Sequence, residues 1–234
     1  MYKLTFETSA THVPILSKPQ LDIIGENLVG DFCPDAMTHP QEIDIDRFLT
    51  RYLGMELDYK NLSHCGLYLG MTVFEDCDSI PVFNFDKWRA EYISVKAGTV
   101  IIDNSLLEDK QEHRYRFTAA HEGAHEVLHP GYFANLAETV RSTGDFTPMV
   151  QCRVDTARIK GGRGTNRTDR DWMEWQANRL ASAILMPKSM VIKVARQAQL
   201  RRTSVNAPLE AVAATFNVSN DAASYRLREL GFIR

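Results

Sequence analysis

Residues 114–129 show the clearest helical pattern in the chain. Apolar side chains recur every three or four residues along this stretch, at Phe117, Ala120, Ala124, Val127 and Leu128. This spacing is typical of an amphipathic helix. Pro130 follows, and a proline disfavours helical backbone at the residue before it. The pattern predicts a helix that ends near residue 129, and we expect it to begin near Ser105, whose hydroxyl can cap it.

A second helix is predicted over residues 171–186. Its apolar positions also recur at helical spacing, at Met173, Ala177, Leu180, Ala181, Ile184 and Leu185. Glu174 shares a side of this helix with Ala177, Asn178 and Ala181. A carboxylate above small residues can point into a site between two packed helices.

The C-terminal part, residues 188–234, is predicted to be helical. Residues 208–216 and 221–230 read as two helices joined by a tight turn, with Ser219 as N-cap and Gly231 as C-cap. The spacing resembles a helix-turn-helix. It leaves Tyr225, Arg226 and Arg228 available on the second helix for contact with DNA.

The pattern between residues 55 and 103 changes to short alternating segments that are typical of strands. We expect strands at 55–59, 67–74, 80–84, 92–95 and 99–103, with Lys96–Gly98 as the turn of a hairpin between the last two. Helices are predicted upstream over residues 21–32 and 42–53, with Gly54 as a C-cap. Residues 131–140 read as helical, 148–155 as a strand, and 158–170 as an exposed glycine-rich basic loop.

Together these elements predict an α+β fold in which a small antiparallel sheet packs on the helix of residues 114–129. We expect one domain over residues 1–187 and a helix-turn-helix-like segment over residues 188–234. No stretch has the roughly 18 apolar residues that a membrane span needs. The first residues show no signal-peptide pattern, and the four cysteines form no C-x-x-C pair. These features predict a cytoplasmic protein with reduced thiols and no membrane partner.

Charge is distributed unevenly along the chain. The net charge is −3, which argues against a protein that coats nucleic acid. Residues 1–60 carry 10 acidic and 5 basic side chains, whereas residues 188–234 carry 3 acidic and 8 basic ones. The asymmetry is consistent with different partners at the two ends, or with ordinary variation among solvated surface charges.

The helix predicted at residues 114–129 contains His121-Glu122-Gly-Ala-His125, an H-E-x-x-H motif. Histidines at i and i+4 lie on one face of a helix and can share a Zn²⁺ ion, with the intervening glutamate as general base. The alternative is a buried amphipathic helix whose histidines only form hydrogen bonds. The motif therefore predicts a metal site with Glu122 as its catalytic residue.

A catalytic zinc site usually has three protein ligands. His129 is the nearest candidate for the third, but it lies about 80° round an ideal helix from His121. Glu174 on the second helix is a better candidate, and Cys65 is a weaker one. The side chain that would stabilise an oxyanion stays open among His129, Tyr132 and Asn178.

The two helices together resemble the ImmA/IrrE family of zincin-like metallo-endopeptidases. The residues that carry the resemblance are Phe117-Thr-x-Ala-His121-Glu122-x-x-His125-x-x-x-His129, then Glu174-x-x-Ala-Asn178 through Ile184-Leu-Met-Pro187. The chain departs from the family pattern in Leu180, where phenylalanine is usual, and in the 48 residues between His125 and Glu174. The resemblance implies that His121, His125 and Glu174 bind zinc and that Glu122 is the general base.

The resemblance also implies a zinc-dependent endopeptidase that cleaves a partner transcriptional repressor with a helix-turn-helix. Such repressors control a mobile element, a toxin–antitoxin-like pair or a stress response. An alternative is a regulatory binding module without catalysis, which binds a repressor or DNA through its basic C-terminal segment. A toxin-like peptidase with broad targets is a third possibility.

Overall fold

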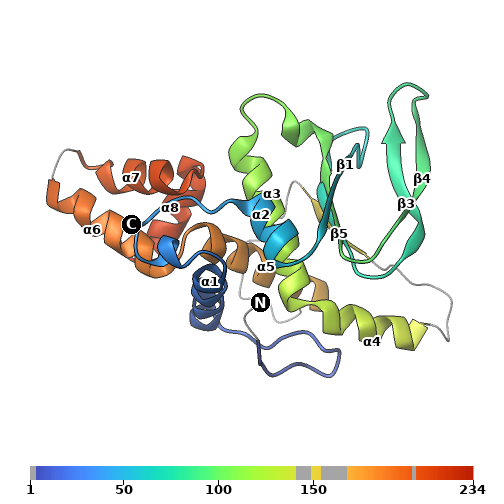
Figure 1. Ribbon diagram of the computed structural model, residues 1–234, viewed down its shortest axis with the longest axis horizontal. Coiled ribbons are helices and arrows are strands. Elements are labelled where there is room, and N and C mark those ends of the chain that lie inside the picture. The colour runs from blue at the N-terminus through green and yellow to red at the C-terminus, as the bar shows by residue number, and fades with distance from the viewer. Residues whose placement is uncertain (1–3, 141–148, 154–167, 202–203, 234) are drawn as a thin grey trace.

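The computed structural model describes residues 4–140, 149–153, 168–201 and 204–233 and has an α+β architecture (Figure 1). Three C-terminal helices lie at one end of the molecule and the strands at the other, with α3 and α5 between them. The bounds of these five helices are α3 (Glu112–Leu128), α5 (Asp169–Leu185), α6 (Lys188–Arg201), α7 (Ala207–Phe216) and α8 (Asn220–Glu229). The predicted fold class is correct at this level.

Four strands form the main sheet in the order β1-β5-β2-β6. Their bounds are β1 (Glu56–Lys60), β2 (Tyr68–Val73), β5 (Thr99–Asp103) and β6 (Met149–Arg153). β2 pairs antiparallel with β5 and β6, but β1 pairs parallel with β5. The sheet is therefore mixed, and the prediction of a purely antiparallel sheet is wrong. Every residue of β5 is buried, because both faces of the sheet are covered here: Val100 and Ile102 belong to one apolar cluster and Ile101 to another.

The predicted hairpin between residues 92–95 and 99–103 is also wrong. β4 (Arg89–Val95) instead pairs with β3 (Cys77–Asn84) in a separate two-stranded sheet. Gly98 does form the expected turn, with a φ of 78°, and its N–H donates to the carbonyl of Val73. This bond directs the following strand alongside β2. The backbone of β5 therefore pairs with β1 on one side and β2 on the other, while β4 pairs with β3.

Helix α1 (Lys18–Phe32) agrees with the prediction, but the helix predicted over residues 42–53 is shorter and irregular. α2 covers only Ile45–Arg47 and continues into the wider π-helical turn η2 (Phe48–Tyr52). The Asp44 side chain accepts a hydrogen bond from the Arg47 N–H, so it caps the helix three residues after the predicted start. Gly54 follows with a φ of 75°, as predicted.

The helix that carries the H-E-x-x-H motif starts later than predicted. Residues Asn104–Leu107 form the separate 3-10 turn η3, in which the Asp103 side chain accepts from the Ser105 N–H. Ser105 therefore does not cap α3, which begins at Glu112. α3 ends before Pro130 as predicted, and α4 (Pro130–Val140) follows directly.

In the C-terminal part, a tight turn joins α7 to α8 near the predicted positions. Asn217 adopts a left-handed backbone conformation between α7 and α8, and the Ser219 side chain accepts from the Ala222 N–H. The expectation for Arg226 is wrong, because this side chain is fully buried and donates to Asp22 and to the Met186 carbonyl. Tyr225 and Arg228 on the same helix are exposed.

One apolar core connects the C-terminal helices with the rest of the chain. It contains buried residues of α1, α3, α5, α6, α7 and α8, among them Leu21, Ala120, Ala177, Val191, Val212 and Leu227. The division at residue 187 into two units stays a prediction. Most of the predicted loop at 158–170 lies outside the described residues.

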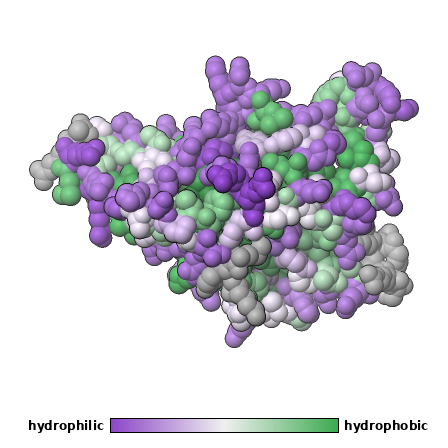
Figure 2. Space-filling model, in the orientation of Figure 1, coloured by the Kyte–Doolittle hydropathy of each residue, from purple (hydrophilic) through white to green (hydrophobic). Residues whose placement is uncertain are grey.

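The face in Figure 2 is mostly hydrophilic, with smaller hydrophobic patches that include one over the β3–β4 hairpin. Among the helices that the structure describes, none is both long enough and apolar enough to cross a membrane.

Candidate metal centre

The two histidines of the motif lie one turn apart on α3, where both are fully buried. Their Nε2 atoms are 3.0 Å apart. The helical spacing of four residues brings the two rings to one face, as the sequence predicts. The histidines therefore present one nitrogen each to a common point.

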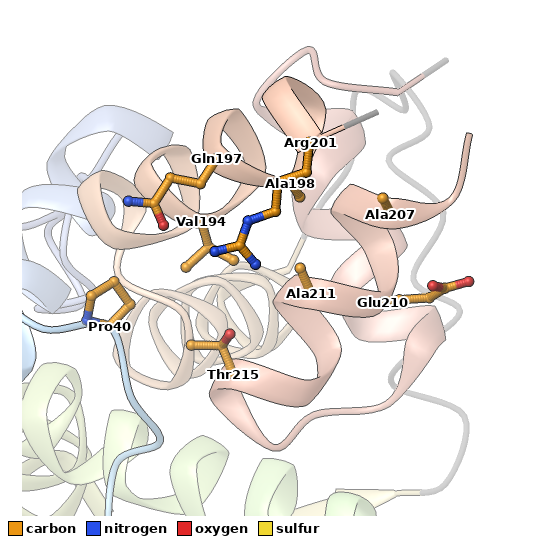
Figure 3. Close-up of a pocket in the computed structure, with 9 residues that line it drawn as sticks. All are labelled: Pro40, Val194, Gln197, Ala198, Arg201, Ala207, Glu210, Ala211 and Thr215. Atoms are coloured by element: carbon orange, nitrogen blue, oxygen red, sulfur yellow. The ribbon is translucent and has the colours of Figure 1, made fainter. Parts of the chain in front are cut away.

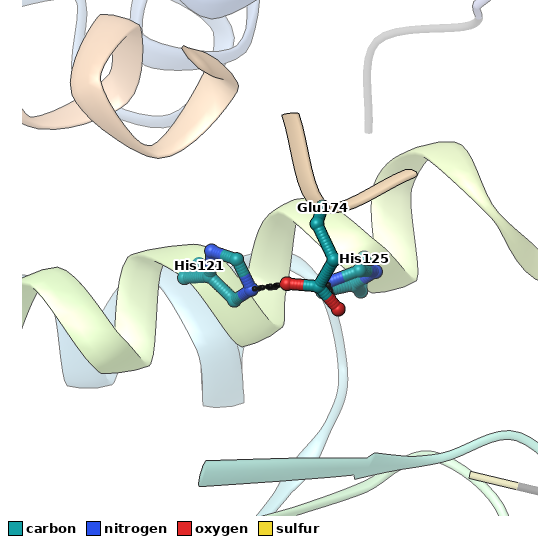
Figure 4. A group of neighbouring side chains, drawn as sticks. All are labelled: His121, His125 and Glu174. Carbon is teal, nitrogen blue, oxygen red and sulfur yellow. Dashed lines mark hydrogen bonds and ion pairs between the residues drawn. The ribbon is translucent and has the colours of Figure 1, made fainter. Parts of the chain in front are cut away.

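Glu174 reaches the same point from α5, which packs against α3 (Figure 4). Its Oε2 lies 3.4 Å from His121 Nε2, and its Oε1 lies 3.8 Å from His125 Nε2. The Glu174 residue is only 5% exposed, so its carboxylate faces the two histidines in a buried site. Thr168 begins α5 with a capping box to Asp171, and Glu174 follows about one turn further along the helix.

These three residues fit a metal ion. Among the described residues, they form the group of His, Cys, Asp or Glu side chains whose ligand atoms lie within 4.8 Å of one another. Tetrahedral zinc with ligands at about 2.0–2.1 Å would separate them by roughly 3.3 Å, close to the observed 3.0, 3.4 and 3.8 Å. A buried carboxylate beside two imidazoles also needs a cation or proton to offset its charge. The alternative third ligand Cys65 is exposed and lies outside the group.

The pKa values of the two histidines move in opposite directions. Burial lowers the pKa of His121, but hydrogen bonding and attraction to Glu174 outweigh it, and the net pKa is raised. Burial lowers the pKa of His125 well below its usual range, and the neighbouring His121 and His129 lower it further. His125 is therefore held neutral, which is the form of histidine that binds a metal.

His129 lies behind His125 rather than at the metal point. Its Nδ1 is 3.0 Å from His125 Nδ1, and its Nε2 is 3.0 Å from Gln176 Oε1. Burial lowers the pKa of His129 to about 4, against the opposing effect of the bond to Gln176. Because both ring nitrogens have partners, His129 has no nitrogen left for a metal or an oxyanion. Tyr132 and Asn178 remain as the open candidates for the oxyanion.

The side chain of Glu122 extends from α3 to strand β2. Thr72 donates from its hydroxyl to Glu122 Oε2 at 2.6 Å, and both residues are fully buried. Gly70 on the same strand leaves room for the carboxylate, since a Cβ at this position would lie 2.6 Å from Glu122 Oε1. The strand thus holds Glu122 in one orientation beside the histidines.

Thr72, Gly70 and Gln176 were not among the residues predicted from the sequence. Thr72 lies 50 residues from Glu122, and Gln176 lies on another helix, 47 residues from His129. No local sequence pattern marks these residues. From the sequence, His129 is a candidate ligand or oxyanion stabiliser, and its contact with His125 is not predicted. Its spacing of four residues from His125 was a signal that the two rings would meet.

A separate hollow of about 390 Å³ lies between α6 and α7 (Figure 3). Nine residues line it: Pro40, Val194, Gln197, Ala198, Arg201, Ala207, Glu210, Ala211 and Thr215. It contains no histidine or cysteine and shares no residue with the metal group. It therefore has no part in the candidate metal centre.

An H-E-x-x-H helix packed on a sheet, with a carboxylate from a second helix beside the histidines, is the arrangement of a metallopeptidase. Comparison with protein families agrees: the family model described as IrrE N-terminal-like domain matches residues 155–228. This match confirms the resemblance to the ImmA/IrrE family and supports a metallopeptidase type of function. The matched segment contains Glu174, whereas His121 and His125 precede it. No curated protein matches the chain.

Proposed function

We propose that this protein is a zinc-dependent endopeptidase in which His121, His125 and Glu174 bind the metal and Glu122 is the general base. The observation that carries the proposal is the convergence of the three ligand atoms within 4.8 Å, next to a glutamate that a strand holds in place. A site that only stabilised the fold would not need Glu122.

Zinc held by His121, His125 and Glu174 would supply Lewis-acid activation of a water molecule and of the peptide carbonyl. Glu122 accepts a proton from the attacking water through its carboxylate. The same carboxylate then delivers this proton to the amine nitrogen as the peptide C–N bond breaks. Thr72 keeps the carboxylate oriented during both transfers, because its hydroxyl donates to Oε2.

The resemblance to the family supports a transcriptional repressor with a helix-turn-helix as the substrate. Direct DNA contact by α8 would depend on Tyr225 and Arg228, because Arg226 is buried. Few phosphate contacts would give weak binding that depends only shallowly on salt. The structure thus gives less support to a module that acts by binding DNA than to peptidase chemistry.

The test is zinc content and cleavage in two variants that separate the two roles. We expect about one zinc per wild-type chain after dialysis without chelator, and a large loss of zinc in Glu174→Ala. Glu122→Gln should keep its zinc but lose cleavage of the repressor, because an amide cannot accept the proton.

Glu138→Ala is a suitable control, because Glu138 is an exposed glutamate on α4. It should match the wild type in zinc content and in cleavage. Wild-type cleavage by Glu122→Gln would refute the general-base role. A folded wild type without zinc would refute the metal site.

A further inference from the structure

A continuous chain of buried hydrogen bonds runs from His125 away from the metal group. His125 Nδ1 is 3.0 Å from His129 Nδ1, and His129 Nε2 is 3.0 Å from Gln176 Oε1. Gln176 Nε2 then donates to the backbone carbonyl of Pro14 at 2.6 Å. His125, His129 and Gln176 are each at most 1% exposed, so no water competes for these bonds.

The backbone carbonyl of Pro14 fixes the donor and acceptor of every hydrogen bond in this series. A backbone carbonyl can only accept, so the Gln176 amide nitrogen faces Pro14 and its oxygen faces His129. His129 must then carry its proton on Nε2, which leaves Nδ1 as an acceptor. His125 in turn must carry its proton on Nδ1. The lone pair of His125 therefore lies on Nε2, the atom that faces His121 and Glu174.

We propose that Pro14, Gln176 and His129 form a relay that fixes the tautomer and the ring orientation of His125, which makes His129 and Gln176 positioning residues for the metal site. The inference rests on the proposed metal site and adds the residues that prepare it. Metal-binding histidines usually donate their second ring N–H to a partner of this kind.

The secondary structure positions each residue of the relay. His129 is the C-cap of α3, and its N–H still donates to the His125 carbonyl, so the helical spacing of four residues is kept. Gln176 follows Glu174 by two residues, so α5 supplies both the third ligand and the relay. Pro14 belongs to the N-terminal segment, which a β-bridge to Thr8 holds.

The proposed tautomers of His125 and His129 can be tested without a bound metal. In the metal-free wild type, long-range ¹H–¹⁵N spectra of the histidine rings should show His125 protonated on Nδ1 and His129 protonated on Nε2. A His125 ring with its proton on Nε2 would overturn the proposal. This measurement decides the relay even if the wild type binds no zinc, an outcome that would refute the proposed function alone.

Zinc affinity, measured by competition with a chelator, tests the consequence of the relay. His129→Leu removes the acceptor, and we expect its zinc affinity to fall by about 10- to 100-fold. His129→Asn places an amide oxygen where the acceptor nitrogen lies, so it should recover part of the lost affinity. An unchanged affinity in folded His129→Leu would overturn the proposal.

Gln176→Leu provides a second test if His129→Leu does not fold. It cuts the relay at a residue that contacts His129 and Pro14, and it should mix the tautomers of His125 and weaken zinc binding. Gln199→Leu, at an exposed position of α6, is the control and should change neither measurement. Wild-type tautomers in Gln176→Leu would contradict the relay.

Discussion

At the scale of single residues, the candidate general base is defined by its neighbours on β2. The Thr72 hydroxyl bonds to Glu122 Oε2, and the missing side chain of Gly70 gives Oε1 its space. A carboxylate confined on both sides loses the freedom to turn away from its proton donor. Among the described hydrogen bonds, the Thr72 side chain contacts Glu122 and none of the three candidate metal ligands.

Removal of the Thr72 hydroxyl should slow cleavage and leave zinc binding intact. Thr72→Val keeps the shape of the side chain but loses the donor, and we expect the cleavage rate to fall by about 10-fold. Thr72→Ser keeps the hydroxyl and should be slowed less. Measurement of kcat and zinc content for both variants checks this, and a wild-type kcat in Thr72→Val would contradict it.

A methyl group at Gly70 should displace the general base. The Cβ of Gly70→Ala would lie 2.6 Å from Glu122 Oε1 and 2.8 Å from Thr118 Cγ2, so the carboxylate has to move. We expect cleavage to fall by about 100-fold, as for other misplaced catalytic groups, with zinc still bound. Kinetic and metal analysis of one preparation would show this. Full activity would mean that the carboxylate does not need its observed position.

At the scale of secondary-structure elements, the position of α5 decides whether Glu174 reaches the histidines. α1 packs on the other side of α5, with Gly25 against Ala183. A Cβ at Gly25 would lie 2.6 Å from Ala183 Cβ and 3.0 Å from the Ala183 backbone carbon. The two helices can approach this closely only because residue 25 has no side chain.

Gly25→Ala should therefore destabilise the protein. Overpacking at the helix crossing should cost about 1–3 kcal/mol, more than the gain of up to about 1 kcal/mol from helix propensity. Gly30→Ala in the same helix is the matched control, because its Cβ would make only an ordinary contact, 3.6 Å from Met37 Cγ. Urea unfolding of both variants tests the prediction, and equal stabilities would contradict it.

At the scale of the whole molecule, a buried ionic network ties the C-terminal helix to α1 and α5. Arg226 on α8 and Arg179 on α5 both donate to Asp22 on α1. Glu229 on α8 pairs with Arg179. Burial lowers the pKa of the Arg226 guanidinium, and Asp22 opposes this effect. The network therefore joins residues that are about 200 positions apart in the sequence.

Arg226→Met should leave part of this network without a partner. We expect a loss of about 3 kcal/mol in the free energy of unfolding, as when one member of a buried ion pair is removed. Arg228→Met makes the same change at an exposed position of the same helix and should have little effect. Urea unfolding compares the two, and an equal small effect would show that the network contributes little.

Features that depend on local spacing could be read from the amino-acid sequence. The H-E-x-x-H helix, the helix of Glu174 and the turn between α7 and α8 were predictable because periodicity, caps and prolines act within a few residues. The candidate ligands were predictable for the same reason, with help from the resemblance to a family. The start of α3 was not predictable in this way, since residues near Ser105 form a separate turn that Asp103 caps.

Which segments contact each other could not be read from the sequence and depends on the folded chain. Alternation shows that residues 99–103 form a strand, but the pairing with β1 and β2 depends on contacts far along the chain. The same holds for Arg226, whose charge predicts exposure until Asp22 offers it a buried partner. It holds also for His129, whose partner Gln176 lies on another helix and is itself bonded to Pro14. Long-range contacts of this kind have no local signature, and the folded chain alone brings them together.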